Sequence, residues 1–457
     1  MFLEKIKSPG IAHLSYILGD GDEAVVIDPR RDCDVYCDIA SREGVTIRHI
    51  FETHRNEDYV IGSLDLARKT GAEIHHGSAL DFEYGQAVAE GDTFAVGGLN
   101  LSIMETPGHT MESISIVVTD QNFGPKPVGV FTGDALFVGD VGRTDFFPDR
   151  KEEVAGMLYD SIFKKLLPLG DQTLLFPAHG AGSVCGDGMA DREFSTLGYE
   201  RENNPVLLKT DRDEFIQHKV SEKHNQPPYF RKMEEYNLKG APPLSDRLPG
   251  DVPLSADDVA AAVDAGAVLL DLRSPEAFAG AFIPNALAIP VNMLPAYGGY
   301  FLEYDFDIIL IPETHKQVKE AVRHLVRMGY DRVAGYLKGG LHAWEVSGRN
   351  YGRIPAVHAA DLDARLKSDE NLLLLDVRKA TEFEASRLPG ARHIFLGDLP
   401  GRLDKIPEDR PIVTFCGSGQ RAIIAASILK RNGFEQVEDC LGSMEACKEL
   451  GCEIKEG

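Results

Sequence analysis

The sequence predicts an α/β protein of three domains. Two stretches of the C-terminal half repeat each other at a constant offset of 105 residues, and each alternates short apolar strands with helical stretches. That alternation is typical of a parallel α/β sheet. The preceding region, residues 1–245, has more strand-like segments and carries histidines and aspartates where these segments end. A chain of 457 residues is long enough for three domains of ordinary size.

Charge and hydropathy narrow the class of partner. Acidic residues outnumber basic ones 72 to 48, which gives a formal charge of −24. Because such a field repels phosphate backbones, nucleic acid is not expected as a partner. Anionic small molecules remain possible where Arg side chains, backbone N–H groups or a metal reverse the local potential. No uninterrupted apolar stretch approaches the ~18 residues of a membrane span.

Cysteine usage and the N-terminus indicate a reducing compartment. Seven cysteines occur at irregular spacing without a Cys-x-x-Cys pair. Residues 1–10 have no apolar segment of signal-peptide length. An odd number of unpaired thiols without such a segment predicts reduced cysteines and a cytoplasmic location.

The elements of the N-terminal region follow from local patterns. Two apolar runs around a Gly/Asp turn predict a β-hairpin. Later apolar runs predict four further strands, and a longer amphipathic stretch predicts a helix. The predicted segments are 16–18 and 24–28 for the hairpin, 46–51, 99–105, 114–118 and 129–132 for the strands, and 149–166 for the helix. The polar, proline-containing segment 200–248 predicts one helix and then a linker.

Five residues that can ligate or support a metal lie where these strands give way to turns. They are His54, Asp58, His109, Asp134 and His179. Strand ends deliver ligands with little motion, as a metal of fixed geometry requires. One histidine after a strand is more often a hydrogen-bonded structural residue, but five such positions together favour a metal site.

These motifs resemble the metallo-β-lactamase fold over roughly residues 1–240, which implies an αββα sandwich. Hydrolytic members carry Thr-His-x-His-x-Asp-His, whereas this chain has Asn56 and Tyr59 at the second and last His positions. That departure removes two imidazoles needed for a second metal. The remaining set of His54, His109 and Asp134 matches the iron ligands of persulfide dioxygenases in the same superfamily. Two imidazoles and one carboxylate suit Fe(II) that binds O₂ and substrate together.

A long similarity to the same dioxygenases covers residues 133–145 and 177–183. The resemblance implies that Asp58 and His179 are pocket groups or partners of the ligands. Arg143 is expected either to hold an anionic substrate or to pair with Asp145, the two roles being equally compatible with the sequence. Cys185 is expected to be a packed, inert thiol.

A second chemical motif lies in the last repeat, where an apolar strand at 412–415 leads into Cys416 and a helix. The loop is Cys416-Gly417-Ser418-Gly419-Gln420-Arg421. Backbone N–H groups, the helix N-terminus and Arg421 favour a thiolate that can carry sulfur as a persulfide. This loop resembles the active loop of rhodaneses, and the similarity covers residues 352–457. Cys447 occupies a position where rhodaneses often have Trp, and packing is expected there.

The middle repeat lacks this chemistry. Alignment of 308–311 with 412–415 places Pro312 opposite Cys416, and the loop has neither a thiol nor a glycine-rich cradle. It resembles a rhodanese that cannot carry sulfur, for which a spacer or docking role is a hypothesis.

The sequence therefore predicts a metallo-β-lactamase αββα sandwich followed by two rhodanese-like α/β domains, at 1–245, 246–351 and 352–457. The resemblance implies one Fe(II) per chain and oxidation of a low-molecular-weight thiol persulfide by O₂ to sulfite and thiol, in sulfide detoxification. Cys416 would exchange sulfur among persulfide, sulfite and thiosulfate, in a direction that the residues leave open. A homo-oligomer is expected.

Two alternatives remain. One is a mononuclear zinc thioester hydrolase of the glyoxalase II type fused to a rhodanese. The other is a scaffold with a dead metal site, in which only Cys416 is active. The identity of the carrier thiol does not follow from the sequence.

Overall fold

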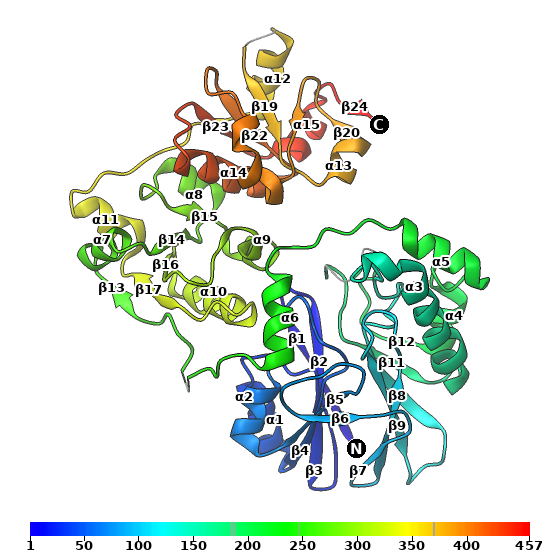
Figure 1. Cartoon of the computed structure of the whole chain (residues 1–457). Coiled ribbons are helices and arrows are strands. Elements are labelled where there is room, and N and C mark those ends of the chain that lie inside the picture. Colours follow the sequence, from blue (N-terminus) through cyan, green and yellow to red (C-terminus); the bar gives the residue numbers. More distant parts are fainter. Residues whose placement is uncertain (184–185, 187, 246, 369–370) are drawn as a thin grey trace. The chain divides into compact units, whose positions relative to one another are not determined.

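The computed structural model (Figure 1) describes residues 1–183, 186, 188–245, 247–368 and 371–457. These residues form two compact units. The first comprises residues 1–244 with 326–329, and the second comprises 245–325 with 330–457. Cys185, for which packing was expected, lies outside the described residues.

Two six-stranded sheets form the first unit. In spatial order the first sheet contains β1 (Phe2–Ser8), β2 (His13–Asp20), β3 (Glu23–Ile27), β4 (Thr46–Phe51), β5 (Glu73–Gly77) and β6 (Gln86–Val88). The second contains β12 (Ser195–Thr196), β11 (Leu174–Pro177), β10 (Pro127–Gly133), β9 (Ile114–Asp120), β8 (Leu99–Glu105) and β7 (Thr93–Val96). Buried side chains from both sheets, among them Tyr16, Phe51, Leu101 and Phe131, form one core between them.

Helices cover the outer face of each sheet, as Figure 1 shows. Side chains of α1 (Asp34–Glu43) and α2 (Ser63–Thr70) form a second core with the outer side of the first sheet. Side chains of α3 (Lys151–Asp160) and α5 (Arg212–Ser221) form a third core with the second sheet. The predicted αββα sandwich is thereby confirmed.

Most predicted elements of this unit are present. The segments 46–51 and 99–105 coincide with β4 and β8, and the predicted hairpin is the antiparallel pair β2–β3. The predicted helix at 149–166 is less regular than expected. It begins with one 3-10 turn, η1 (Pro148–Arg150), continues as α3, and then widens into a π-helical turn, η2 (Ser161–Leu166), followed by η3 (Leu167–Leu169).

The prediction of a single helix and a linker at 200–248 is wrong. This region contains most of α4 (Leu197–Asn203), all of α5, and α6 (Phe230–Lys239). Its few apolar residues are buried, Phe215, Phe230 and Met233 among them. The polar composition of the segment led to the prediction of a linker. Helices that cover a sheet need only one apolar face, so a few buried apolar residues are sufficient. Pro227 and Pro228 stand between α5 and α6 and separate the two helices.

The second unit contains two five-stranded parallel sheets with the same strand order. The first sheet has the order β13 (Pro253–Leu254), β17 (Val333–Leu337), β16 (Ile308–Ile311), β14 (Val268–Asp271), β15 (Leu287–Ala288). The second has the order β18 (Ala356–Val357), β23 (Val437–Cys440), β22 (Ile412–Phe415), β19 (Leu373–Asp376), β21 (Arg392–His393). A short pair, β20 (Ser386–Arg387) with β24 (Lys455–Glu456), completes the C-terminal repeat. The duplication predicted from the constant offset is thus confirmed in the topology.

Helices alternate with these strands in both repeats. The middle repeat contains α7 (Ala256–Asp264), α8 (Pro275–Gly280), η4 (Val291–Met293), α9 (Leu294–Phe301), α10 (His315–Arg327) and α11 (Gly340–Val346). The last repeat contains α12 (Ala359–Lys367), α13 (Ala380–Ala385), η5 (Leu396–Lys405), α14 (Gln420–Arg431) and α15 (Ser443–Leu450). Among the described residues no helix is both long and apolar enough to cross a bilayer.

The repeated Asp-x-Arg motif has one structural role in both repeats. Asp271 pairs with Arg273, and the guanidinium then donates to the carbonyl oxygen of Ala281 at 2.8 Å. Asp376 and Arg378 form the same pair, and Arg378 donates to the carbonyl oxygen of Ser386 at 2.7 Å. Each buried pair ties the end of a central strand to the segment that follows it.

Candidate metal centre and sulfur site

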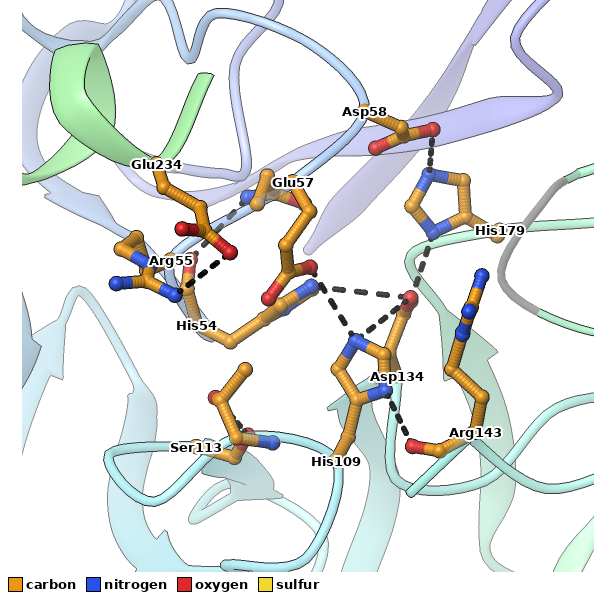
Figure 2. A network of polar contacts seen from close by, with 12 residues as sticks. His54, Arg55, Glu57, Asp58, His109, Ser113, Asp134, Arg143, His179 and Glu234 are labelled. Atoms are coloured by element: carbon orange, nitrogen blue, oxygen red, sulfur yellow. Dashed lines mark hydrogen bonds and ion pairs between the residues drawn. The ribbon is translucent and has the colours of Figure 1, made fainter. Parts of the chain in front are cut away.

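His54, His109 and Asp134 meet in the first unit from three separate strand ends. His54 follows β4, His109 follows β8, and Asp134 follows β10. The Oδ2 atom of Asp134 lies 3.7 Å from Nε2 of His54 and 3.5 Å from Nε2 of His109. All three side chains are buried, and Figure 2 shows them converging. Their spacing allows one metal ion to contact all three atoms.

The Nδ1 atoms of both histidines contact other polar groups of the protein. Nδ1 of His109 donates to the carbonyl oxygen of Arg143 at 3.0 Å. Nδ1 of His54 lies 2.9 Å from Oγ1 of Thr53, whose own hydroxyl donates to Asp28. These bonds turn both Nε2 lone pairs toward Asp134, as in metal-binding histidines.

The converging atoms fit a cation. Nε2 of His54, Nε2 of His109 and Oδ2 of Asp134 are buried and have no hydrogen-bond partner of ordinary geometry among the described residues. Burial lowers the pKa of His54 to about 3, so the imidazole is neutral and able to ligate. Burial alone raises the pKa of Asp134, but His179 and His54 bring it well below the usual range, so this carboxylate is ionised. Buried polar atoms without partners are costly, and a divalent ion would satisfy all three.

His179 contacts the Asp134 carboxylate through one ring nitrogen and Asp58 through the other. Nδ1 of His179 lies 2.8 Å from Oδ1 of Asp134, and its Nε2 lies 3.2 Å from Oδ2 of Asp58. Burial lowers the pKa of His179, but the two flanking carboxylates outweigh it and raise the pKa well above its usual value. His179 is therefore placed to orient the Asp134 carboxylate and does not join the three converging atoms.

Arg143 forms the ion pair with Asp145 that was one of its two expected roles; its expected role in holding an anionic substrate stays a prediction. Its guanidinium pairs with both oxygens of Asp145 at 2.6 and 2.7 Å, and Nη1 donates to the carbonyl oxygen of Asn225. The guanidinium also lies over the Phe146 ring. Arg143 acts on the centre through its backbone carbonyl, which fixes His109.

Glu57 is a residue of the centre that the sequence analysis missed. Its buried carboxylate points toward His109 in Figure 2, with Oε2 3.5 Å from Nε2 of that histidine. An acid inside the same short loop as His54 was the available signal. It passed unnoticed because the family pattern gives that position no role.

Helix α6 supports the ligand loop and was also missed. The buried Asn237 side chain donates to the carbonyl oxygens of Asn56 and Tyr59, both at 2.7 Å, and accepts from the N–H of Ile61. Tyr229, just before α6, donates to the carbonyl oxygen of Asp58 at 3.0 Å. These contacts join positions about 180 residues apart in the sequence, so no local sequence pattern predicts them.

The two departures from the hydrolase pattern lie inside this loop. The Asn56 amide donates back to the carbonyl oxygen of His54 at 3.2 Å. The Tyr59 ring packs on His13, with ring centroids 4.1 Å apart. Both side chains are thus engaged within the fold at positions where the hydrolytic pattern has imidazoles.

A second group of possible ligands, His49, Glu73 and His75, lies on β4 and β5. Nδ1 of His49 is 3.0 Å from Nε2 of His75, and Glu73 is largely exposed. The buried Nδ1 of His75 has no partner among the described residues. Because metal-binding histidines usually donate through the other ring nitrogen, this group lacks the support found around His54 and His109.

The Cys416 loop forms a cradle at the end of β22. The N–H of Gly419 donates to Sγ of Cys416 at 3.1 Å, and Gly419 takes a left-handed backbone with φ of 96°. The N–H of Cys416 donates to Oγ of Ser443. A backbone N–H that donates to the sulfur in this way can stabilise a negative sulfur.

Arg421 lies beside the same loop at the start of α14. Its guanidinium pairs with both oxygens of Glu382 at 2.6 and 2.8 Å. A Cβ placed on Gly417 would come within 3.0 Å of the guanidinium, so the glycine allows Arg421 to approach the loop closely. Glu382 lies in α13, and its role in holding Arg421 was not predicted.

The corresponding loop of the middle repeat is closed by a side chain. The Gln317 amide oxygen accepts from the N–H groups of Glu313 and Thr314, at 2.7 and 3.2 Å. The Gln317 side chain thus caps the start of α10, at the position where the last repeat has the Cys416 loop. In the last repeat Cys447 is fully buried in the core, and burial raises its pKa, in keeping with the packing role expected for it.

Comparisons with known proteins identify one family in the first unit and another in both repeats of the second. The family model described as Metallo-beta-lactamase superfamily matches residues 9–179, and the Rhodanese-like domain model matches 255–347 and 358–450. The mitochondrial persulfide dioxygenase ETHE1 of Mus musculus is 30% identical over 239 residues, which cover 50% of this chain and 83% of the mouse protein. Hydroxyacylglutathione hydrolase GloC of Haemophilus influenzae is 28% identical over 215 residues, covering 42% of this chain and 91% of that protein.

One solved structure extends over more of the chain. It is a metallo-beta-lactamase from Staphylococcus aureus subsp. aureus COL, 32% identical, with a TM-score of 0.66. The similarity covers 74% of this chain and 98% of that protein, so it reaches beyond the first unit.

Proposed function

The chain belongs to the metallo-β-lactamase superfamily and carries two rhodanese-like domains, and we propose that it is an iron-dependent persulfide dioxygenase coupled to a sulfurtransferase. The observation that carries the proposal is the pairing, in one chain, of a buried two-histidine, one-carboxylate centre with a cysteine in an anion cradle. Relatives that include a persulfide dioxygenase, together with the rhodanese-like domains, place this enzyme in sulfur metabolism.

The centre fits Fe(II) by its donor set. His54, His109 and Asp134 would hold one ion per chain and leave coordination positions open. When bound there, Fe(II) would supply those open positions and the redox chemistry that O₂ requires. The substrate would be a low-molecular-weight thiol persulfide. Its outer sulfur loses four electrons to O₂, and with one water the products are sulfite, the thiol and two protons.

The chain's own residues determine how rigid the centre is. Thr53 and the Arg143 carbonyl fix the two imidazoles, while His179 and Asp58 fix the Asp134 carboxylate. Asn56 and Tyr59 are engaged elsewhere, which favours a centre with one metal. Glu57 adds a second buried carboxylate beside His109, and we propose that it raises the affinity of the centre for a divalent ion.

Cys416 would carry sulfur in the second reaction. Its thiolate attacks the outer sulfur of thiosulfate, the S–S bond breaks, and the electron pair leaves with sulfite. Cys416 is left as a persulfide, stabilised by the Gly419 N–H and the positive end of α14. The reverse reaction consumes sulfite, the product of the first site, and yields thiosulfate. Gly417, Ser418 and Gln420 would complete the sulfur-binding loop.

The test is O₂ consumption by the full chain loaded with Fe(II), given glutathione persulfide or coenzyme A persulfide. Persulfide-dependent uptake that is absent from His109→Ala is expected, together with sulfite in equal amount. Stoichiometric iron without uptake on either persulfide would overturn the dioxygenase proposal.

A zinc thioester hydrolase is the second candidate, favoured by the similarity to hydroxyacylglutathione hydrolase GloC. It predicts zinc in the purified protein and hydrolysis of S-lactoylglutathione without O₂. A chain that retains no metal and transfers sulfur through Cys416 alone would instead be a scaffold with a dead first site.

A further inference from the structure

Ser443, a buried residue of the last repeat, has a strained backbone. It is the first residue of α15, and its φ of 43° lies in the left-handed region. This region costs free energy for a residue that has a Cβ, whereas the adjacent Gly442 adopts it without that cost. Strain of this kind persists where the surrounding structure holds it, and it is frequent at functional positions.

The Ser443 hydroxyl bridges the ends of β22 and β23, which are neighbouring strands of the last sheet. Its Oγ donates to the carbonyl oxygen of Cys440 at 2.7 Å and accepts from the N–H of Cys416 at 3.1 Å. Because the single hydroxyl proton goes to Cys440, the oxygen is left to act as an acceptor for Cys416. All three residues are buried, so solvent water does not compete for these bonds.

The start of α15 thereby holds both backbone groups of Cys416. The N–H of Cys416 donates to Ser443, and its carbonyl oxygen accepts from the N–H of Met444 at 3.1 Å. Three residues further along the loop, the N–H of Gly419 donates to Sγ of Cys416. The direction of the Cys416 backbone therefore determines where its sulfur lies relative to this donor.

The middle repeat has neither half of this arrangement. Pro312 stands opposite Cys416 and has no N–H to donate. Gly340, the first residue of α11, stands opposite Ser443 with a φ of 60°. A Cβ on Gly340 would come within 2.8 Å of the carbonyl oxygen of Pro312, so a serine there would require the backbone to shift. The same strand order is thus built with glycine at this position, and the strained serine occurs in the repeat that has a thiol to position.

We propose that Ser443 is a positioning residue of the sulfur site, whose hydroxyl fixes the backbone of Cys416 and thereby holds its sulfur on the Gly419 N–H. This inference rests on the proposed sulfurtransferase function. In that reaction the Cys416 thiolate attacks the outer sulfur of thiosulfate, and the electron pair of the S–S bond leaves with sulfite. Such an attack requires a nucleophile of fixed direction, because a small displacement of the attacking atom slows a reaction strongly.

The experiment compares two variants of the full chain that lack the same hydroxyl. Ser443→Ala keeps the Cβ and its strain, whereas Ser443→Gly removes the hydroxyl and the strain together. In the thiosulfate:cyanide assay we expect kcat to fall about tenfold in both variants. KM for thiosulfate should change less than about twofold, because neither variant alters the charge of Arg421. Ser443→Gly should unfold at a higher temperature than Ser443→Ala.

Ser427→Ala is the matched control. Ser427 is buried in the same domain, and its hydroxyl has the same pattern of bonds. It accepts from the N–H of Ala288 at 3.1 Å and donates to the carbonyl oxygen of Ile424 at 2.8 Å. The control therefore loses an equivalent pair of buried bonds about two helical turns along α14 from Gln420. Its thermal stability should fall, and its kcat should stay within about twofold of wild type.

A second measurement needs no turnover. Amide hydrogen exchange at Gly419, resolved by fragment mass spectrometry, reports on the bond from its N–H to Sγ of Cys416. Exchange should be at least about fivefold faster in both Ser443 variants than in wild type, and it should be unchanged in Ser427→Ala.

The outcomes separate the two proposals. A wild-type chain that transfers no sulfur would overturn the sulfurtransferase function, while exchange at Gly419 would still decide whether Ser443 positions Cys416. An active wild type whose kcat both variants retain within twofold would overturn the inference. So would a loss of kcat confined to Ser443→Ala, because that loss would follow the strain in the fold and not the hydroxyl. Exchange at Gly419 that neither variant alters would also overturn it.

Discussion

The metal centre and the sulfur loop are built in opposite ways. His54, His109 and Asp134 come from three strand ends of the first unit, and the groups that hold them come from further segments, including α6. Cys416 and its cradle come from six consecutive residues at one strand end. Both sites place reactive groups where strands end, but only the second has its reactive groups in one local motif, which Ser443 and Glu382 support from other segments. The difference shows why a site can be recognised from one loop in one case and needs the whole sandwich in the other.

Of the changes that test this comparison, replacement of Cys416 by serine should have the largest effect on activity. Because no other residue of the loop offers a thiol, sulfur transfer from thiosulfate to cyanide should fall by at least about a thousandfold. Iron content and persulfide-dependent O₂ uptake should be unchanged. Thiocyanate formation measures the first and an oxygen electrode the second. Undiminished transfer would remove Cys416 from the mechanism.

The reciprocal change, His109→Ala, should break the first site alone. One of three converging ligands is lost, so bound iron should fall to a small fraction of one per chain, and O₂ uptake should fall at least about a hundredfold. Metal analysis and the oxygen electrode provide the readouts, with His49→Ala as the control outside the centre. Loss of sulfur transfer in His109→Ala would show that the two sites are not separable.

Strand β23, next to the strand that leads into the sulfur loop, carries a buried acid, Asp439, whose titration makes the stability of the last domain depend on pH. Burial raises the pKa of Asp439 to about 7, against the opposing effect of Thr414, which donates to it. The folded state therefore favours the protonated acid. Its contribution to stability is present below about pH 4 and is lost as the pH rises to about 7, with a ceiling of about 4 kcal/mol.

Asp439→Asn should remove that pH dependence and raise the free energy of unfolding at pH 8. Urea unfolding at pH 5 and pH 8 measures both, with the exposed Asp361→Asn as the control. A variant whose stability falls between pH 5 and 8 as steeply as that of wild type would contradict the assignment of this acid.

Asn237→Ala tests whether the metal centre depends on a distant helix. The change leaves the carbonyl oxygens of Asn56 and Tyr59 and the N–H of Ile61 without their buried partner. We expect the first unit to lose about 3 kcal/mol of stability and the centre to bind metal more weakly. Thermal unfolding and metal titration are the measurements, with the exposed Asn203→Ala as the control. Unchanged metal affinity would show that the ligand loop needs no support from α6.

Glu57→Gln should have the smallest effect. The amide keeps the shape of the side chain but removes a negative charge 3.5 Å from Nε2 of His109. Affinity for a divalent ion should fall about tenfold, with little change in folding. Co(II) titration followed by absorption gives the affinity, and the exposed Glu83→Gln serves as the control. Equal affinities would mean that Glu57 acts on neither the ligands nor the ion.

The sequence alone determined much of this protein. The constant offset predicted two α/β repeats, and the matching strand orders confirm it. Strand-end residues indicated the metal centre, and the structure brings His54, His109 and Asp134 together. These signals are local, because strand periodicity, turns and a cysteine loop are encoded within a few residues.

Only the tertiary structure decided the rest. The segment expected to be a linker folds into helices, one of which carries the Asn237 that holds the ligand loop, and Arg143 pairs with Asp145. Glu57 faces the centre, although it stands in no motif that predicts such a role. The physical reason is the same in each case. A contact between side chains far apart in sequence depends on how whole elements pack, and the periodicity of each element specifies its own buried face but not its partner.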